Sequence, residues 1–222
     1  MAAAARQLLC GFVFLMTLGG IAGARAETEA SEITAAEKLL FQTDHMANVA
    51  GASRLEYGYS RDGEHPVSDR VTLKLDEKRS VSADYLTLSR HMAFPDVDDA
   101  HGNPLLLYFL EDDLREMNLR TNGRPDYFRR LIRRALASSA LKVEATEVTV
   151  GGRTLPAQRV SIEPFRDDPN ANLHYPALAG KSYEFVLASS LPGQIALLAT
   201  HVPLAAGKSE SVRLEWSGVG PL

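Results

Sequence analysis

Hydrophobic side chains change their period along this chain, and the order of the changes limits the folds open to it. Apolar residues alternate with polar ones from Leu55 to Leu88, recur at helical spacing from Asn103 to Leu136, and alternate again from Val148 to Trp216. A parallel sheet needs a helix between successive strands, whereas here the central helical residues form one block. The pattern therefore predicts an α+β fold with a large antiparallel β-sheet and a central two-helix insertion.

Local signals place the helices. Thr34 and Glu37 have the spacing of a capping box, which predicts a helix that continues from Lys38 to Val49. Asn103-Pro104 is typical of an N-cap followed by proline in the first turn, and Arg124-Pro125 repeats the signal for a second helix.

The strands are expected where one face of each segment is apolar and the other polar. Turn signals at Asp62-Gly63, Gly151-Gly152 and Pro192-Gly193 separate neighbouring strands. The segment 167–180 is long and polar, and we expect a loop that serves as a lid or contact site. The predicted strands centre on Leu55–Tyr59, Val71–Leu75, Val81–Leu88, Val148–Val150, Leu155–Ile162, Tyr183–Leu187, Ile195–His201 and Val212–Trp216.

Residues 1–26 have the order of a secretory signal peptide. Arg6 precedes a short apolar run from Leu8 to Leu18, and Ala24-Arg25-Ala26 offers a small-x-small cleavage site. An uncleaved membrane anchor is the alternative, but the second half of the segment is glycine- and alanine-rich rather than strongly apolar. We therefore expect residues 1–26 to be removed and residues 27–222 to form a single α+β domain.

Cleavage would also change the chemistry open to the chain. Cys10 is the only cysteine, so the processed protein would have no thiol, and an exported protein without disulfides indicates the periplasm. Loss of Arg6 and Arg25 would leave 22 basic against 28 acidic side chains. This acidic balance argues against a nucleic-acid partner.

The order of elements resembles one known family. A signal peptide, an N-terminal helix, a strand meander, a central helical insertion and further strands are similar to the periplasmic lipoprotein-carrier fold. The resemblance covers most of the processed chain by element order, and no family motif carries functional residues over. It implies a curved, half-barrel-like sheet packed on the N-terminal helix, with room for acyl chains.

Five aromatic residues in the predicted strands could line such a cavity. Half-barrel sheets present an aromatic face to an apolar guest, although the same residues also suit an ordinary core. These candidate ligand-binding residues are Tyr57, Tyr59, Tyr85, Phe185 and Trp216.

The second central helix carries four arginines opposite its apolar stripe. Guanidinium groups bind phosphate and carboxylate in a bidentate manner, so the face suits an anionic membrane surface or an envelope protein partner. Pairing with nearby acids such as Glu111 is the alternative. The four candidates are Arg129, Arg130, Arg133 and Arg134.

The densest polar cluster precedes the first central helix. Its carboxylates and imidazoles suit zinc or manganese, or else form a solvated loop. The candidate metal ligands are His91, Asp96, Asp98 and His101, with Asp99 between them.

Motifs for nucleotide binding and hydrolysis are missing from the sequence. The Gly-Lys-Ser triplets at Lys181 and Lys208 lack the earlier glycine that a phosphate loop needs, and no Gly-x-Ser-x-Gly or His-Glu-x-x-His occurs. We expect a non-catalytic periplasmic binding or carrier protein for a lipid or another apolar ligand, with no cofactor. An accessory protein-interaction module is the first alternative, and a metal-dependent enzyme is the second.

Overall fold

A single antiparallel sheet of eight strands organises the protein. The computed structural model describes residues 33–222, so the predicted signal peptide lies outside the described residues. The strand order is β3-β2-β1-β8-β7-β6-β5-β4, and every neighbouring pair is antiparallel. The strands are β1 (Ser53–Asp62), β2 (Val67–Leu75), β3 (Val81–Tyr85), β4 (Glu144–Val150), β5 (Arg153–Ile162), β6 (Ser182–Leu187), β7 (Ile195–Pro203) and β8 (Ser209–Pro221).

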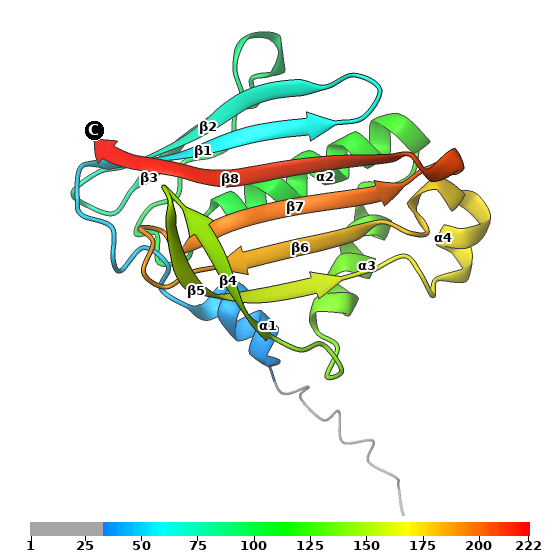
Figure 1. Cartoon of the computed structure of the whole chain (residues 1–222). Coiled ribbons are helices and arrows are strands. Elements are labelled where there is room, and N and C mark those ends of the chain that lie inside the picture. The colour runs from blue at the N-terminus through cyan, green and yellow to red at the C-terminus, as the bar shows by residue number, and fades with distance from the viewer. Residues whose placement is uncertain (1–32) are drawn as a thin grey trace, which may run out of the picture. The chain divides into compact units, whose positions relative to one another are not determined.

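The predicted fold class is confirmed. The sheet is open and curved, and the longest helices lie together on one of its faces (Figure 1). These helices are α2 (Leu105–Thr121) and α3 (Pro125–Leu136), and a short N-terminal helical segment accompanies them. The expected sheet with an N-terminal helix and a central two-helix insertion is therefore the architecture that this sequence adopts.

Alternation of side chains along the strands builds the core between sheet and helices. Leu55, Tyr57 and Tyr59 of β1 are buried, and β2 repeats the pattern through Val71 to Leu75. Phe109 and Phe128 close this core from the helix side, each with at most 1% of its surface exposed. Burial of these apolar side chains is the main force that holds the helices on the sheet.

The β4–β5 hairpin bends over the other face of the sheet (Figure 1). Val160 and Ile162 of β5 join the main core, whereas Ala157 packs with Val186 and Leu191 in a second apolar cluster. Residues of opposite parity in one strand thus face opposite sides of the sheet. Val148, Val150 and Leu155 of the hairpin pack against this second cluster and so cover part of it.

The N-terminal helix is shorter than predicted. α1 (Ala35–Glu37) has the expected capping box and continues as the π-helical turn η1 (Lys38–Gln42), where the helical structure ends rather than at Val49. The Thr43 hydroxyl donates to the Lys38 carbonyl, and His45 Nε2 lies 2.8 Å from the Leu39 carbonyl oxygen. Side chains thus satisfy carbonyl groups that further helical turns would otherwise satisfy.

The segment 167–180 contains short helices rather than an irregular loop. α4 (Pro169–His174) begins at Asp168, whose carboxylate accepts the Ala171 N–H, and η3 (Pro176–Leu178) follows directly. The two remaining short elements are η2 (Leu88–Arg90) and η4 (Ala205–Gly207). Asp168 also accepts a hydrogen bond of 2.5 Å from Tyr127, which fixes α4 on α3.

Candidate functional site

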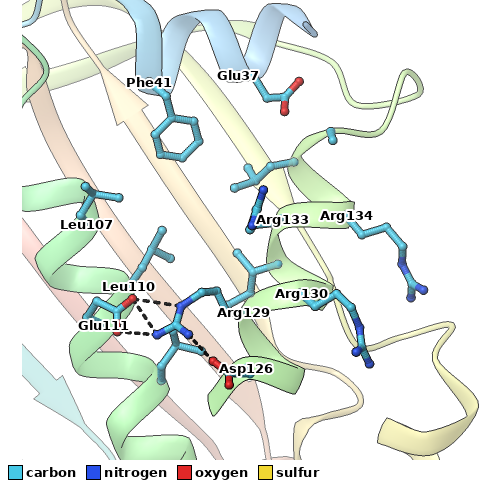
Figure 2. A pocket seen from close by; sticks show the side chains of 14 residues that line it. Glu37, Phe41, Leu107, Leu110, Glu111, Asp126, Arg129, Arg130, Arg133 and Arg134 are labelled. Atoms are coloured by element: carbon cyan, nitrogen blue, oxygen red, sulfur yellow. Dashed lines mark hydrogen bonds and ion pairs between the residues drawn. The ribbon is translucent and has the colours of Figure 1, made fainter. Parts of the chain in front are cut away.

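An apolar groove lies on the helical side of the molecule. It runs between the N-terminal helix, α2 and α3 and encloses about 740 Å³, which is within the usual range of roughly 300–1,000 Å³ for small-molecule sites. Figure 2 shows its side chains. The apolar lining residues are Phe41, Leu107, Leu110, Leu114, Ile132 and Leu136.

Helical spacing explains why these residues share one surface. Leu107, Leu110 and Leu114 are separated by three and four residues on α2, so they form one row along that helix. Ile132 and Leu136 form the matching row on α3. The two rows face each other across the groove, and Phe41 covers part of it from η1 (Figure 2).

Two of the apolar side chains remain open to solvent. Leu107 is 56% exposed and Phe41 is 42% exposed, whereas Leu114, Ile132 and Leu136 are buried beneath them. An exposed leucine alone needs no explanation, but two large apolar groups over a common hollow indicate a binding surface.

One ion pair joins α3 to α2 across the groove. Arg129 of α3 lies 2.9 Å from Glu111 of α2 and 2.6 Å from Asp126 in its own first turn. The hydrogen bonds to Glu111 raise the pKa of Arg129, so this guanidinium stays charged. The expectation that an acid such as Glu111 pairs with this arginine face is confirmed here.

A second link connects the N-terminal helix to the end of α3. The Thr34 hydroxyl lies 3.2 Å from the Leu136 carbonyl oxygen and 3.1 Å from the Glu37 carboxylate. The Glu37 carboxylate in turn accepts the Thr34 N–H at 3.0 Å. The capping box therefore holds the start of the N-terminal helix at the end of α3, where Glu37 lines the groove.

All four predicted arginines line the groove, but their guanidinium groups point in different directions. The side chains of Arg129 and Arg133 lie toward the groove, whereas the outer ends of Arg130 and Arg134 extend away from it (Figure 2). Arg130 lies over the Tyr127 ring at 5.5 Å, and Arg134 reaches Asp168 at 3.4 Å. Residues four apart are neighbours on a helix, so the four arginines divide into two pairs.

The five predicted aromatic residues belong to the core rather than to the groove. Tyr57, Tyr85 and Phe185 have no exposed surface, and Tyr59 is 3% exposed. Tyr57 and Tyr59 border two smaller hollows elsewhere on the surface, and none of the five residues lines the groove. Trp216 is partly buried and packs against both apolar clusters. Ordinary core packing, the alternative interpretation, explains their pattern.

The predicted metal ligands are not brought together. Within residues 33–222 no group of three or more histidine, cysteine or acidic side chains is arranged to hold a metal ion. Asp98 accepts from the Ser80 hydroxyl, and His101 Nδ1 is 2.8 Å from Asp44, which also binds Arg79. Asp98 and His101 are thus held by partners elsewhere in the chain, and His101 Nε2 also lies 3.7 Å from Asp99. The four candidates His91, Asp96, Asp98 and His101 do not form a common site among the described residues.

Sequence reasoning did not identify the apolar part of the groove. Glu37 and Phe41 were expected only as residues of the N-terminal helix, and Leu107 and Leu110 only as part of the helical apolar pattern between Asn103 and Leu136. One signal could have indicated otherwise, because Leu105–Leu110 is apolar on every side of its helix except for the tyrosine hydroxyl. Such a helix has more apolar surface than one sheet can cover.

Lys181 has a structural role that the sequence did not reveal. Its ammonium is 2.5 Å from Asp113, and the Tyr183 hydroxyl donates to the same carboxylate at 2.6 Å. Lys181 is 5% exposed and Asp113 is 9% exposed. The Gly-Lys-Ser triplet at this lysine is therefore part of a buried ion pair below α2, as expected for a triplet that does not bind phosphate.

The comparisons leave the function to be inferred from this geometry. No family model matches the chain, and no curated protein matches its sequence. Among residues 33–222, no helix has both the length and the apolar character needed to cross a membrane.

Proposed function

We propose that this chain is an exported, non-catalytic periplasmic protein that binds or carries an apolar ligand in the groove between the N-terminal helix, α2 and α3. The observation that carries the proposal is a hollow of about 740 Å³ with an apolar floor, into which Leu107 and Phe41 expose much of their surface. The lipoprotein-carrier resemblance supports the same class, but the proposed site lies outside the sheet–helix core.

The physical basis is removal of apolar surface from water. Burial of a CH₂ group contributes about 0.8 kcal/mol, so a ligand that covers the exposed parts of Phe41 and Leu107 gains affinity with each added methylene. The groove walls are held by the Arg129 ion pairs and the capping box before any ligand arrives. Such prior order reduces the entropy lost on binding.

The remaining arginines supply a surface for delivery. The guanidinium ends of Arg130 and Arg134 point away from the groove that both residues line (Figure 2), so they can meet an anionic membrane or an envelope protein while the groove is occupied. Export through residues 1–26 would place the protein between membranes, where apolar molecules require a soluble carrier.

A chain-length series tests the proposal. Calorimetric titration with hexanoate, octanoate and decanoate at neutral pH is expected to show affinity rising about fourfold per added methylene. Leu107→Glu places a charge over the apolar floor and should weaken decanoate binding at least about tenfold. Leu119→Glu on the same helix is the matched control, because Leu119 is 69% exposed and does not line the groove.

Two results would contradict the proposal. Affinity that does not change with chain length excludes the apolar floor as the binding surface, and equal loss in both leucine variants excludes this groove. A groove between helices also accepts an amphipathic partner helix, which is the second candidate function. An absence of binding by every chain length would favour that accessory interaction module.

A further inference from the structure

The acidic and basic side chains around the groove differ in whether they have a partner of opposite charge or a hydrogen-bond partner within the chain. Glu37 is held by Thr34, and Glu111 and Asp126 both bind Arg129. Each acidic group of the rim thus has a partner within the chain. An added cation would have to displace one of these contacts.

Two of the arginines that line the groove, Arg130 and Arg133, form no ion pair with an acidic side chain among the described residues, and Arg133 is the one whose side chain lies toward the groove. Within residues 33–222 its guanidinium has no acidic side chain within ion-pair distance, and it lies toward the groove in Figure 2. It follows Ile132 and lies three residues before Leu136, so the cation stands at the edge of the apolar floor. Its surroundings combine an unpaired positive charge with exposed apolar surface.

We infer that the ligand is an amphiphile with one acyl chain and an anionic head group. The head group accepts bidentate hydrogen bonds from Arg133, and the tail lies over Leu107 and Phe41. This inference rests on the proposed function, and it adds the chemistry of the head and the direction of the ligand. Guanidinium suits this task because its planar donors match the two oxygens of a carboxylate.

The form of the groove supports a single chain. The Arg129–Glu111 contact joins α3 to α2, and the contact between Thr34 and Leu136 joins the N-terminal helix to α3. Between these links the floor on α2 is one row of leucines. One extended tail covers such a row, with its head at Arg133.

A matched pair of ligands tests the inference. Decanoate and n-decanol have the same number of carbons and differ in the charge of the head at neutral pH. Decanoate is expected to bind about tenfold more tightly, as a charge-assisted hydrogen bond allows. Added salt should lower the affinity for decanoate and leave the affinity for n-decanol unchanged, because ionic screening acts only on the charged head group.

Arg133→Met removes the charge and keeps much of the apolar stem. We expect this variant to bind the two ligands with equal affinity, whereas Arg153→Met should keep the wild-type preference. Arg153 is exposed at the β4–β5 hairpin and does not line the groove. Circular dichroism of both variants checks that the fold is retained.

The possible outcomes distinguish a failure of the head-group inference from a failure of the proposed apolar-ligand binding. Equal binding of decanoate and n-decanol by the wild type, or a preference that survives Arg133→Met, overturns the anionic head group. If Leu107→Glu still lowers the affinity for both ligands in that case, the apolar groove remains the binding site and only the anionic head group is excluded. If neither ligand binds the wild type, both proposals fail.

Discussion

Lys181 and Asp113 form a buried ion pair that constrains how α2 packs against β6. Both side chains are nearly inaccessible to water, and Tyr183 donates to the same carboxylate. A buried ion pair adds little net stability over an apolar pair, but removal of one partner leaves an uncompensated charge in the core. The contact therefore acts mainly as a constraint on how α2 meets β6.

Lys181→Met should lower the free energy of unfolding by about 3–5 kcal/mol, because Asp113 then remains buried without its counter-ion. Lys181→Met combined with Asp113→Asn should recover much of this loss, since the amide oxygen still accepts from Tyr183. Urea unfolding of both variants measures the difference. Equal destabilisation in the two variants would show that lost packing, not charge, causes the effect.

Asp112 beside this pair gives a pH dependence with a definite sign. Burial raises the pKa of Asp112 from 3.8 to about 6 in the folded protein. Between these values the folded state binds more protons than the unfolded state, so this group's contribution to stability falls as pH rises through about 6. Tyr85 donates to the carboxylate at 3.3 Å, which offsets part of the penalty.

Asp112→Asn should therefore raise the free energy of unfolding by about 1–3 kcal/mol near neutral pH. The difference from the wild type should disappear as pH falls below the unfolded pKa of 3.8. Urea unfolding across this pH range measures it. Burial lowers the pKa of His45, but this histidine is present in both the wild type and the variant. Its effect on stability therefore cancels when the two free energies of unfolding are subtracted. A variant less stable than the wild type at neutral pH would contradict this account.

Among the elements, Asn103 connects three that are far apart in sequence. Its side-chain oxygen accepts the Leu105 N–H at the start of α2, and its amide donates to Tyr57 of β1 and to the Gly193 carbonyl of the β6–β7 turn. The Asn103 N–H also donates to His45 Nδ1 at 3.2 Å, just beyond η1. The N-cap of α2 is Pro104, one residue after the predicted Asn103, and the Asn103 side chain fixes the start of this helix on the sheet.

Asn103→Ala should cost about 2–4 kcal/mol of stability, because it leaves the Leu105 N–H, the Tyr57 hydroxyl and the Gly193 carbonyl without these buried hydrogen bonds. Asn170→Ala in the exposed first turn of α4 should change stability by no more than about 0.5 kcal/mol. Thermal unfolding of the two variants compares them. A small effect at Asn103 would mean that water replaces its contacts.

The elements also show what sequence patterns could predict. The alternation at Leu55–Tyr59 and the spacing of Phe128, Leu131 and Ile132 located strands and helices, because one buried face imposes a period on the sequence. The predicted end of the N-terminal helix was wrong. Side chains of Thr43 and His45 contact carbonyl groups of the last turn, and the spacing of apolar residues does not reveal such contacts. The helical turns in 167–180 were missed for the same reason, because Asp168 caps a segment without an apolar stripe.

For the whole molecule, the sequence predicted the architecture but not the site. The alternation of apolar and polar residues predicts that Tyr57 and Phe185 lie on the apolar face of the sheet. It does not show whether that face is filled by the core or lines a cavity, and the structure places both residues in the core. The groove instead combines Phe41, Leu107 and Ile132 from three separate segments. Periodicity shows that these residues are apolar on a helix face, but only the packing of the helices shows which part of that face remains uncovered.

One labelling experiment tests the central claim that the ligand lies outside the sheet–helix core. A fatty acid with a photoreactive diazirine near its tail is bound to the purified protein and irradiated, and the labelled peptides are mapped by mass spectrometry. The account predicts labels on peptides that contain Phe41, Leu107 or Leu110, suppressed by excess decanoate. Labels confined to β1 and β6 around Tyr57 and Phe185 would contradict it, because they would place the ligand between sheet and helices.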